Sequence, residues 1–256
     1  MKKLYKYLLN TLPRPLLIRL SYVFKIFAPI LYRGNKVECP VCEKSFSKFL
    51  SYGSDVAHRE NVLCPYDLTL ERHRLMWLYL KNESNFFSAE KLSVLHIAPE
   101  QCFIHLFKKQ KNLDYLTGDL ESPIAEIHFD LHQIPLEENR FDVVFCNHVM
   151  EHVDDPIQCM KEIYRVMKPG GWAIMQVPQD MTRATTYEDP TITSPAEREK
   201  HFWQKDHVRL FGRDYPQWLE KAGFKVAIYD TKQKFEPAVI DKYRLMKDEL
   251  LYIARK

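Results

Sequence analysis

From Leu92 onward, short apolar segments alternate with segments of helical periodicity. The segments that read as strands are 93–97, 114–118, 126–129, 141–146, 172–177, 224–229 and 251–254. Those that read as helices are 100–109, 155–167 and 215–222. Such alternation is typical of βαβ units, whose strands form a largely parallel sheet. The sequence therefore predicts an α/β fold over most of its 256 residues.

Turn residues mark the ends of two of these helices. Lys168-Pro-Gly-Gly171 follows the second helix and Gly223 follows the third, where glycine favours a helix stop. By contrast, residues 179–212 have no clear regular period. An insert of this length in a compact domain is usually functional.

The N-terminal segment, residues 1–36, is basic and carries no acid before position 35. Residues 1–33 read as helix with breaks near Pro13, Pro15 and Pro29. An apolar stripe on this segment comprises Leu16, Leu17, Leu20, Phe24 and Phe27. A basic amphipathic helix can lie on an anionic membrane surface, or its stripe can pack onto the main domain. The sequence leaves both alternatives open and predicts no membrane-spanning helix.

Three of the six cysteines form a cluster in a second segment, residues 37–69. Cys39-Pro-Val-Cys42 and Cys64-Pro-Tyr-Asp67 read as two knuckles of a zinc-ribbon-like module, the second ending in a carboxylate. His58 or His73 is an alternative fourth ligand, and a packed module without metal is the other interpretation. The scattered remaining cysteines are no disulfide framework, so we expect a reducing, cytoplasmic compartment.

Residues 70–256 form the third predicted segment, and their central part resembles the class I S-adenosylmethionine-dependent methyltransferases. The resemblance rests on five segments in order: VLHIAPE at 94–100, the strand ending at Asp119, FDLHQIPL at 129–136, FDVVFCNHVMEHV at 141–153 and EIYRVMKPGG at 162–171. It implies a Rossmann-like sheet of about seven strands with the last strand antiparallel and helices on both faces. It also implies S-adenosylmethionine as the cofactor.

The cofactor is expected outside the carboxyl ends of the first strands, where the strand order reverses. By resemblance, Asp119 accepts both ribose hydroxyls, Asp130 binds the adenine amine, and Asn147 and His148 lie near the methyl group. The whole predicted cofactor set is His96, Ala98, Pro99, Glu100, Asp119, Leu120, Asp130, Leu131, Asn147 and His148. A helix N-cap is the alternative role for Asp119.

The first loop departs from the family pattern, which is acidic and rich in glycine. This chain has His96, Ala98, Pro99 and Glu100 there and no glycine. Proline fixes φ and removes a backbone donor, so the loop cannot follow the usual path unaltered. Glu100 is the candidate to pair with the cofactor's amino group in place of the missing acid.

A bacterial group of methyltransferases resembles this chain over nearly its whole length. The shared segments are the C-P-x-C module, LERHRL at 70–75, the A-P-E loop and HFWQKDHVR at 201–209. The last segment follows the fifth strand, where acceptor-binding residues lie in such enzymes. We predict His207 as the catalytic base, with His201 and Asp206 as further catalytic candidates, because imidazole can accept a proton near neutral pH.

Three functions remain open at this point. The first is methylation of a small polar acceptor, such as a sugar hydroxyl of a glycan, with peripheral contact of residues 1–33 at the inner membrane face. The second is RNA base methylation behind a zinc module, although the acidic balance beyond residue 34 argues against nucleic acid. The third is a non-catalytic scaffold, for which the altered first loop is the argument.

Overall fold

The computed structural model describes residues 12–53 and 58–256, and the chain divides into two compact units. The N-terminal unit extends to Leu78 and includes Phe235–Lys247. The sheet unit comprises Tyr79–Lys234 and Asp248–Lys256. The sequence predicted boundaries at residues 36 and 69. Those boundaries stay a prediction. The two compact units divide at Leu78, and a segment from the C-terminal part of the sequence belongs to the N-terminal unit.

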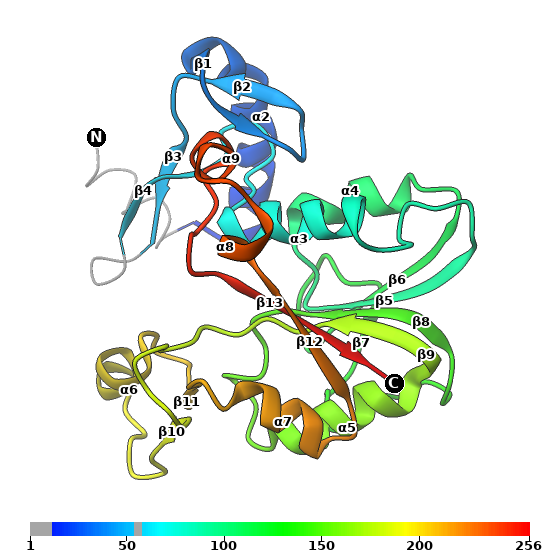
Figure 1. Ribbon diagram of the computed structural model, residues 1–256. Helices are drawn as coiled ribbons and strands as arrows, with labels where there is room; N and C mark the ends of the chain where they lie inside the picture. Colours follow the sequence, from blue (N-terminus) through cyan, green and yellow to red (C-terminus); the bar gives the residue numbers. More distant parts are fainter. Residues whose placement is uncertain (1–11, 54–57) are drawn as a thin grey trace. The chain divides into compact units, whose positions relative to one another are not determined.

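A seven-stranded sheet forms the centre of the sheet unit within the described residues, in the order β12-β13-β9-β8-β5-β6-β7 (Figure 1). The strands are β5 (Leu92–Ile97), β6 (Leu113–Asp119), β7 (Ile127–His128), β8 (Phe141–Cys146), β9 (Met167–Ile174), β12 (Lys225–Asp230) and β13 (Leu250–Arg255). The pairs from β9 to β7 are parallel, and β13 is antiparallel to both neighbours. The predicted Rossmann-like fold with an antiparallel last strand is confirmed.

Helices cover both faces of this sheet, with α5 (Pro156–Val166) and α7 (Tyr215–Lys221) on one face and α4 (Gln101–Lys108) on the other (Figure 1). Both faces of the sheet carry apolar side chains against which helices pack, because successive side chains of a strand such as β8 point to opposite faces. Val144 and Cys146 belong to the core cluster shared with α5, whereas the Phe145 ring lies 5.6 Å from Phe107 of α4. A short helix, α8 (Thr231–Lys234), follows β12.

The strand after α5 begins earlier than predicted. We expected residues 168–171 to be a stop and the strand to cover 172–177, but β9 already pairs at Met167 with Phe141. The register then shifts before Val143 pairs with Trp172, so the turn residues form an irregularity inside the strand. Gly170 has φ +82°, which glycine adopts without steric cost.

The insert after the fifth strand contains short regular elements, which corrects the prediction that residues 179–212 lack them. These are β10 (Tyr187–Glu188), α6 (Pro195–Phe202) and β11 (Arg209–Leu210). The strands β10 and β11 pair antiparallel. Helix α6 begins at a capping signal, because Ser194 accepts a hydrogen bond from the Glu197 amide and Pro195 occupies the first turn.

The N-terminal unit contains two β-hairpins between helices. Its elements are α2 (Arg14–Leu31), β1 (Arg33–Cys39), β2 (Lys44–Phe46), β3 (Leu50–Tyr52), β4 (Arg59–Leu63), the start of α3 (Glu71–Asn82) and α9 (Pro237–Tyr243). The buried Arg74 guanidinium donates to the carbonyl oxygens of Val62, Thr69, Tyr243 and Arg244 at 2.7–2.9 Å. These bonds explain why a segment 169 residues further along the sequence belongs to this unit.

Helix α2 covers the described part of the predicted N-terminal helix, whose residues 1–11 lie outside the described residues. The break expected near Pro29 is not observed: the helix includes Pro29 and ends at Leu31. Leu16, Leu20 and Phe27 of the predicted apolar stripe are exposed. No helix among the described residues has the length and apolar character that crossing a membrane requires.

Candidate active site and metal centre

The predicted cofactor residues of the sheet unit lie where neighbouring parallel strands end. Glu100 follows β5, Asp119 ends β6, and Asn147 and His148 follow β8. The strand β5 lies between β6 and β8, so the strand order reverses here. This is the place at which open α/β sheets bind nucleotides.

In the first loop, an alanine adopts a backbone conformation that usually requires glycine. Ala98 has φ +49° and its amide donates to the Gly118 carbonyl at 2.9 Å. A positive φ favours glycine because a Cβ atom crowds the backbone there. The loop thus adopts at Ala98 a conformation that suits glycine without having one.

Replacing this alanine with glycine should therefore stabilise the protein. We expect Ala98→Gly to raise the free energy of unfolding by about 1 kcal/mol, because the strain of the left-handed residue disappears. Urea unfolding followed by circular dichroism measures this. Ala125→Gly is the matched control, since Ala125 has no positive φ, and it should destabilise the protein. Equal destabilisation by both substitutions would contradict the strain at Ala98.

Both carboxylate oxygens of Glu100 interact with side chains of neighbouring residues. Its Oε2 pairs with His96 Nε2, and its Oε1 accepts a hydrogen bond from Asn147 Nδ2 at 3.1 Å. The other ring nitrogen of His96 lies 2.7 Å from the Tyr115 hydroxyl. Glu100 therefore fixes the end of β5 to the end of β8. Its predicted pairing with the cofactor's amino group stays a prediction.

Asp119 closes a turn at the end of β6. Its Oδ1 accepts the amides of Glu121 at 2.9 Å and Ser122 at 2.8 Å. The residues that follow form no helix, so the alternative role as a helix N-cap does not apply. The adjacent Leu120 is 63% exposed, an uncovered apolar side chain beside the carboxylate.

Asp130 makes a similar turn after β7. Its Oδ1 accepts from the His132 amide at 2.8 Å and lies 2.7 Å from His132 Nδ1. These hydrogen bonds hold the pKa of Asp130 below its ordinary value, so it remains a carboxylate. Leu131 is buried in the core cluster, which leaves only its backbone for a cofactor contact.

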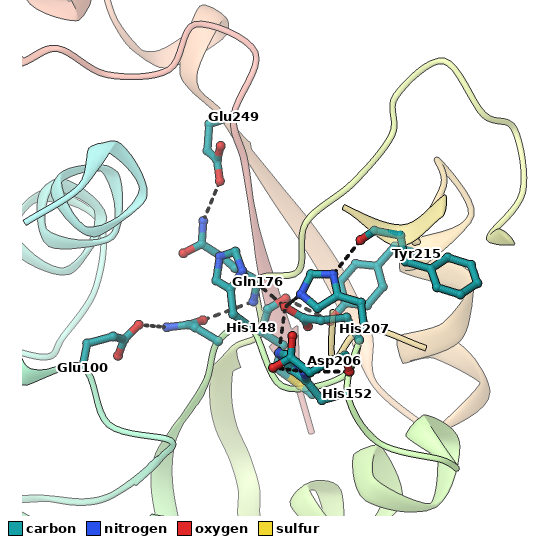
Figure 2. A network of polar contacts seen from close by, with 12 residues as sticks. Glu100, His148, His152, Gln176, Asp206, His207, Tyr215 and Glu249 are labelled. Carbon is teal, nitrogen blue, oxygen red and sulfur yellow. Dashed lines mark hydrogen bonds and ion pairs between the residues drawn. The ribbon is translucent and has the colours of Figure 1, made fainter. Parts of the chain in front are cut away.

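A chain of polar contacts runs from Glu100 across the strand ends (Figure 2). Asn147 Oδ1 accepts from the Gln176 amide at 3.1 Å, and Gln176 Nε2 donates to Glu249 at 3.1 Å. The His148 amide donates to the Gln176 carbonyl at 2.8 Å, and His148 has φ +56°. Strained residues of this kind are common at functional sites.

His207, the first catalytic candidate, lies in a buried cluster with Glu151 and His152 (Figure 2). Its side chain is 1% exposed, and its Nδ1 lies 2.8 Å from the Phe202 carbonyl. Burial lowers the pKa of His207, so the imidazole is neutral at pH 7. Burial raises the pKa of Glu151, but contacts with His148 and His152 hold it below its ordinary value. The catalytic candidates predicted from the sequence included neither Glu151 nor His152.

The other catalytic candidates occupy different surroundings. His201 lies on α6 with its Nδ1 3.0 Å from the Tyr187 hydroxyl, outside the His207 cluster. Asp206 is exposed, and its Oδ2 lies 3.4 Å from His152 Nδ1. Arg209 donates to the carbonyls of Met150, Val153 and Asp154, so it fixes β11 to the loop after β8.

The predicted metal ligands of the N-terminal unit lie together. Atoms of Cys39, Cys42, Cys64 and Asp67 that can bind a metal are all within 4.8 Å of one another. Cys39 Sγ lies 3.0 Å from Asp67 Oδ2, and Cys42 Sγ lies 3.9 Å from Cys64 Sγ. The cysteines are not joined by disulfides. Neither His58 nor His73 belongs to this group of described residues.

The two knuckles have the same backbone design. The Glu43 amide donates to the Cys39 carbonyl at 2.9 Å, and the Leu68 amide donates to the Cys64 carbonyl at 3.0 Å. Glu43 and Leu68 both have positive φ, at +57° and +62°. Asp67 thus occupies the position in the second knuckle that Cys42 occupies in the first. Burial and the neighbouring Cys39 raise the pKa of Asp67 to about 6.

Part of the sheet unit is similar to known proteins. Residues 85–175 match the family described as "Methyltransferase domain". An uncharacterized 37.1 kDa protein in transposon TN4556 of Streptomyces fradiae is 33% identical over 107 residues, which cover 41% of this chain and 30% of that protein. The ubiquinone biosynthesis O-methyltransferase of Thiobacillus denitrificans is 36% identical over 69 residues, which cover 27% of this chain and 25% of the relative. The chain thus spans less than a third of the length of these relatives.

A solved structure shares the fold over most of the chain. The [4+2]-cyclase SpnF superposes with a TM-score of 0.51 and 14% identity, covering 93% of this chain and 95% of that one. At this identity the likeness concerns the fold alone. The matched family confirms the predicted class of domain and its cofactor. The match thus assigns residues 85–175 to a methyltransferase domain, in agreement with the resemblance to the class I S-adenosylmethionine-dependent methyltransferases.

Proposed function

We propose that this chain transfers the methyl group of S-adenosylmethionine to a hydroxyl of a small polar acceptor. The observation that carries the proposal is the position of Asp119, Asn147 and His148 at adjacent strand ends of a matched methyltransferase domain. The relative named as an O-methyltransferase supports oxygen as the accepting atom. A sugar hydroxyl of a glycan remains our preferred acceptor.

The proposed reaction needs a cofactor site and a group that handles the hydroxyl proton. We assign the cofactor to the predicted set from His96 to His148, with the Asp119 carboxylate on the ribose hydroxyls. The acceptor lies on the side of His148 that faces Glu151 and His207. The acceptor oxygen attacks the methyl carbon, the carbon–sulfur electrons return to sulfur, and the proton leaves through this cluster.

An acceptor screen tests this function. The full chain is incubated with S-adenosylmethionine and lipid-linked sugars, free sugars or RNA, and release of S-adenosylhomocysteine is measured. Release that depends on a sugar supports the proposal, whereas release that depends only on RNA would favour base methylation. If the chain binds the cofactor and no acceptor class stimulates release, hydroxyl methylation is refuted.

We also assign zinc to the N-terminal unit, with Cys39, Cys42, Cys64 and Asp67 as ligands. Three thiolates and one carboxylate can complete the four-coordinate geometry that structural zinc adopts. The matching backbone of the two knuckles supports this, because both present a ligand at the same two positions. The zinc ion would hold the β1–β2 turn to the segment after β4.

Peripheral membrane contact through residues 1–33 stays a prediction. Its support is the exposed apolar surface of α2, which comprises Leu16, Leu20, Val23, Ile26, Phe27, Ile30 and Leu31. An apolar helix face of this kind can enter the boundary between headgroups and acyl chains. Binding to vesicles with and without anionic lipid distinguishes this role from packing against protein.

A further inference from the structure

Three side chains at the acceptor end of the sheet unit present metal-binding atoms to one another. They are Glu151 and His152 from the loop after β8 and His207 from the segment before β11 (Figure 2). The atoms of these residues that can bind a metal all lie within 4.8 Å of one another. Glu151 and His207 are each 1% exposed. The cluster is separate from the cysteine cluster of the N-terminal unit.

The outer nitrogens of both imidazoles are held by oxygen acceptors. His207 Nδ1 lies 2.8 Å from the Phe202 carbonyl, which can only accept, so Nδ1 carries the proton. His152 Nδ1 lies 3.3 Å from the Asp206 carbonyl and 3.4 Å from its Oδ2. In the neutral ring the proton on Nδ1 leaves a lone pair on Nε2. Such an outer hydrogen bond typically orients a histidine that binds metal.

The atoms at the centre of the cluster are the Nε2 atoms of His152 and His207 and the carboxylate oxygens of Glu151. Both Nε2 atoms lie 4.0 Å from Glu151 Oε1. His148 Nδ1 lies 3.4 Å from Glu151 Oε1, but among the described residues neither Glu151 oxygen makes a hydrogen bond of normal geometry, and His207 Nε2 makes none. A buried acceptor without a donor is costly, and here a carboxylate faces two nitrogen lone pairs. A cation between them would satisfy all three groups.

We propose that Glu151, His152 and His207 bind a divalent first-row transition-metal ion. Two imidazole nitrogens and a carboxylate oxygen suit ions such as Mn²⁺, Fe²⁺, Co²⁺ or Zn²⁺. At a metal–ligand distance of about 2.1 Å, ligand atoms lie roughly 3 to 3.5 Å apart, so the present separations, two of 4.0 Å and none above 4.8 Å, must shorten when the ion binds. The ring of His152 is 33% exposed, which leaves the outer side of the site accessible.

The metal gives the proposed reaction its means of activating the acceptor, and this role rests on the proposed function. His148 connects the two sites: it belongs to the predicted cofactor set, and its Nδ1 lies 3.4 Å from Glu151 Oε1. A hydroxyl bound to the ion would have a lowered pKa and would lose its proton to solvent on the exposed His152 side of the cluster, because His207 Nε2 would then bind the ion and could not act as the base. The resulting oxygen anion attacks the methyl carbon, and S-adenosylhomocysteine leaves with the carbon–sulfur electron pair.

Titration of the full chain with Mn²⁺, after removal of metal by chelator and dialysis, tests the site. Electron paramagnetic resonance follows the free ion, and Mn²⁺ prefers oxygen and nitrogen ligands to thiolates. We expect one bound Mn²⁺ per chain. Glu151→Gln and His207→Gln should each weaken binding by on the order of 100-fold. The matched control is His105→Gln, on the exposed surface of α4, which should bind Mn²⁺ unchanged.

Folding is checked for every variant by thermal unfolding without metal. Glu151→Gln is expected to fold, because the amide keeps the size of the carboxylate and can still form hydrogen bonds. If either buried variant fails to fold, His152→Gln replaces the more exposed ligand. Equal binding by the unaltered chain and folded Glu151→Gln would overturn the proposal, as would no binding of Mn²⁺, Co²⁺ or Zn²⁺ at millimolar concentration. Cofactor binding without metal binding refutes the metal site alone, and the reverse result refutes the proposed function alone.

Discussion

Asp119→Ala is expected to reduce the affinity for S-adenosylmethionine by at least about 100-fold, since two hydrogen bonds from ribose hydroxyls to a carboxylate are lost. Asp119 ends β6 beside the end of β5. Its Oδ1 accepts hydrogen bonds from two backbone amides, and these bonds fix the orientation of the carboxylate. Equilibrium dialysis with labelled S-adenosylhomocysteine measures the loss.

Two variants separate binding from folding in this experiment. Asp114→Ala is the matched control, because Asp114 lies on the same strand with an exposed side chain, and we expect unchanged affinity. Asp119→Ala should also lose the turn caps, which costs about 1 kcal/mol of stability but leaves the fold intact. Unchanged affinity in folded Asp119→Ala would mean that the cofactor does not lie at the end of β6.

Cys64→Ser is expected to abolish zinc binding and to destabilise the N-terminal unit by at least about 3 kcal/mol. The reason is that the metal joins two turns that share no disulfide. Zinc content per chain, measured by atomic absorption, should fall from close to one to near zero. Limited trypsin digestion should then cut first within the N-terminal unit.

Two further variants test which residues bind the zinc ion. Cys102→Ser, outside the cluster, should retain zinc, and Asp67→Cys should bind it at least as tightly, because thiolate then occupies both positions of each knuckle. Absence of zinc in the unaltered chain, purified without chelator, would favour a packed module without metal. Full zinc content in Cys64→Ser would remove Cys64 from the ligand set.

Most of the sheet could be predicted because its signals are local. An apolar strand or an amphipathic helix carries its period in neighbouring residues, and the segment 141–146 was predicted with the bounds of β8. The helix α6 was missed although its signal, Ser194 followed by Pro195 and Glu197, is present in the sequence. The irregular start of β9 was missed because a Pro-Gly-Gly run ordinarily ends regular structure.

Long-range relations were beyond the reach of the sequence. Arg74 bonds to Tyr243 across 169 residues, and no local pattern announces that Phe235–Lys247 joins the N-terminal unit. The cluster around Glu151 has the same character, since His207 is distant in sequence. The cysteine cluster was predictable as a set, because paired knuckles repeat a recognisable spacing.

The central claim is that this chain binds S-adenosylmethionine although its first loop has alanine and proline where glycine is usual. Calorimetric titration of the full chain with S-adenosylmethionine and S-adenosylhomocysteine tests it most directly. We predict saturable one-to-one binding of both ligands with dissociation constants in the micromolar range. Absence of binding to either ligand at millimolar concentration would contradict the account and favour a scaffold that retains the fold without the chemistry.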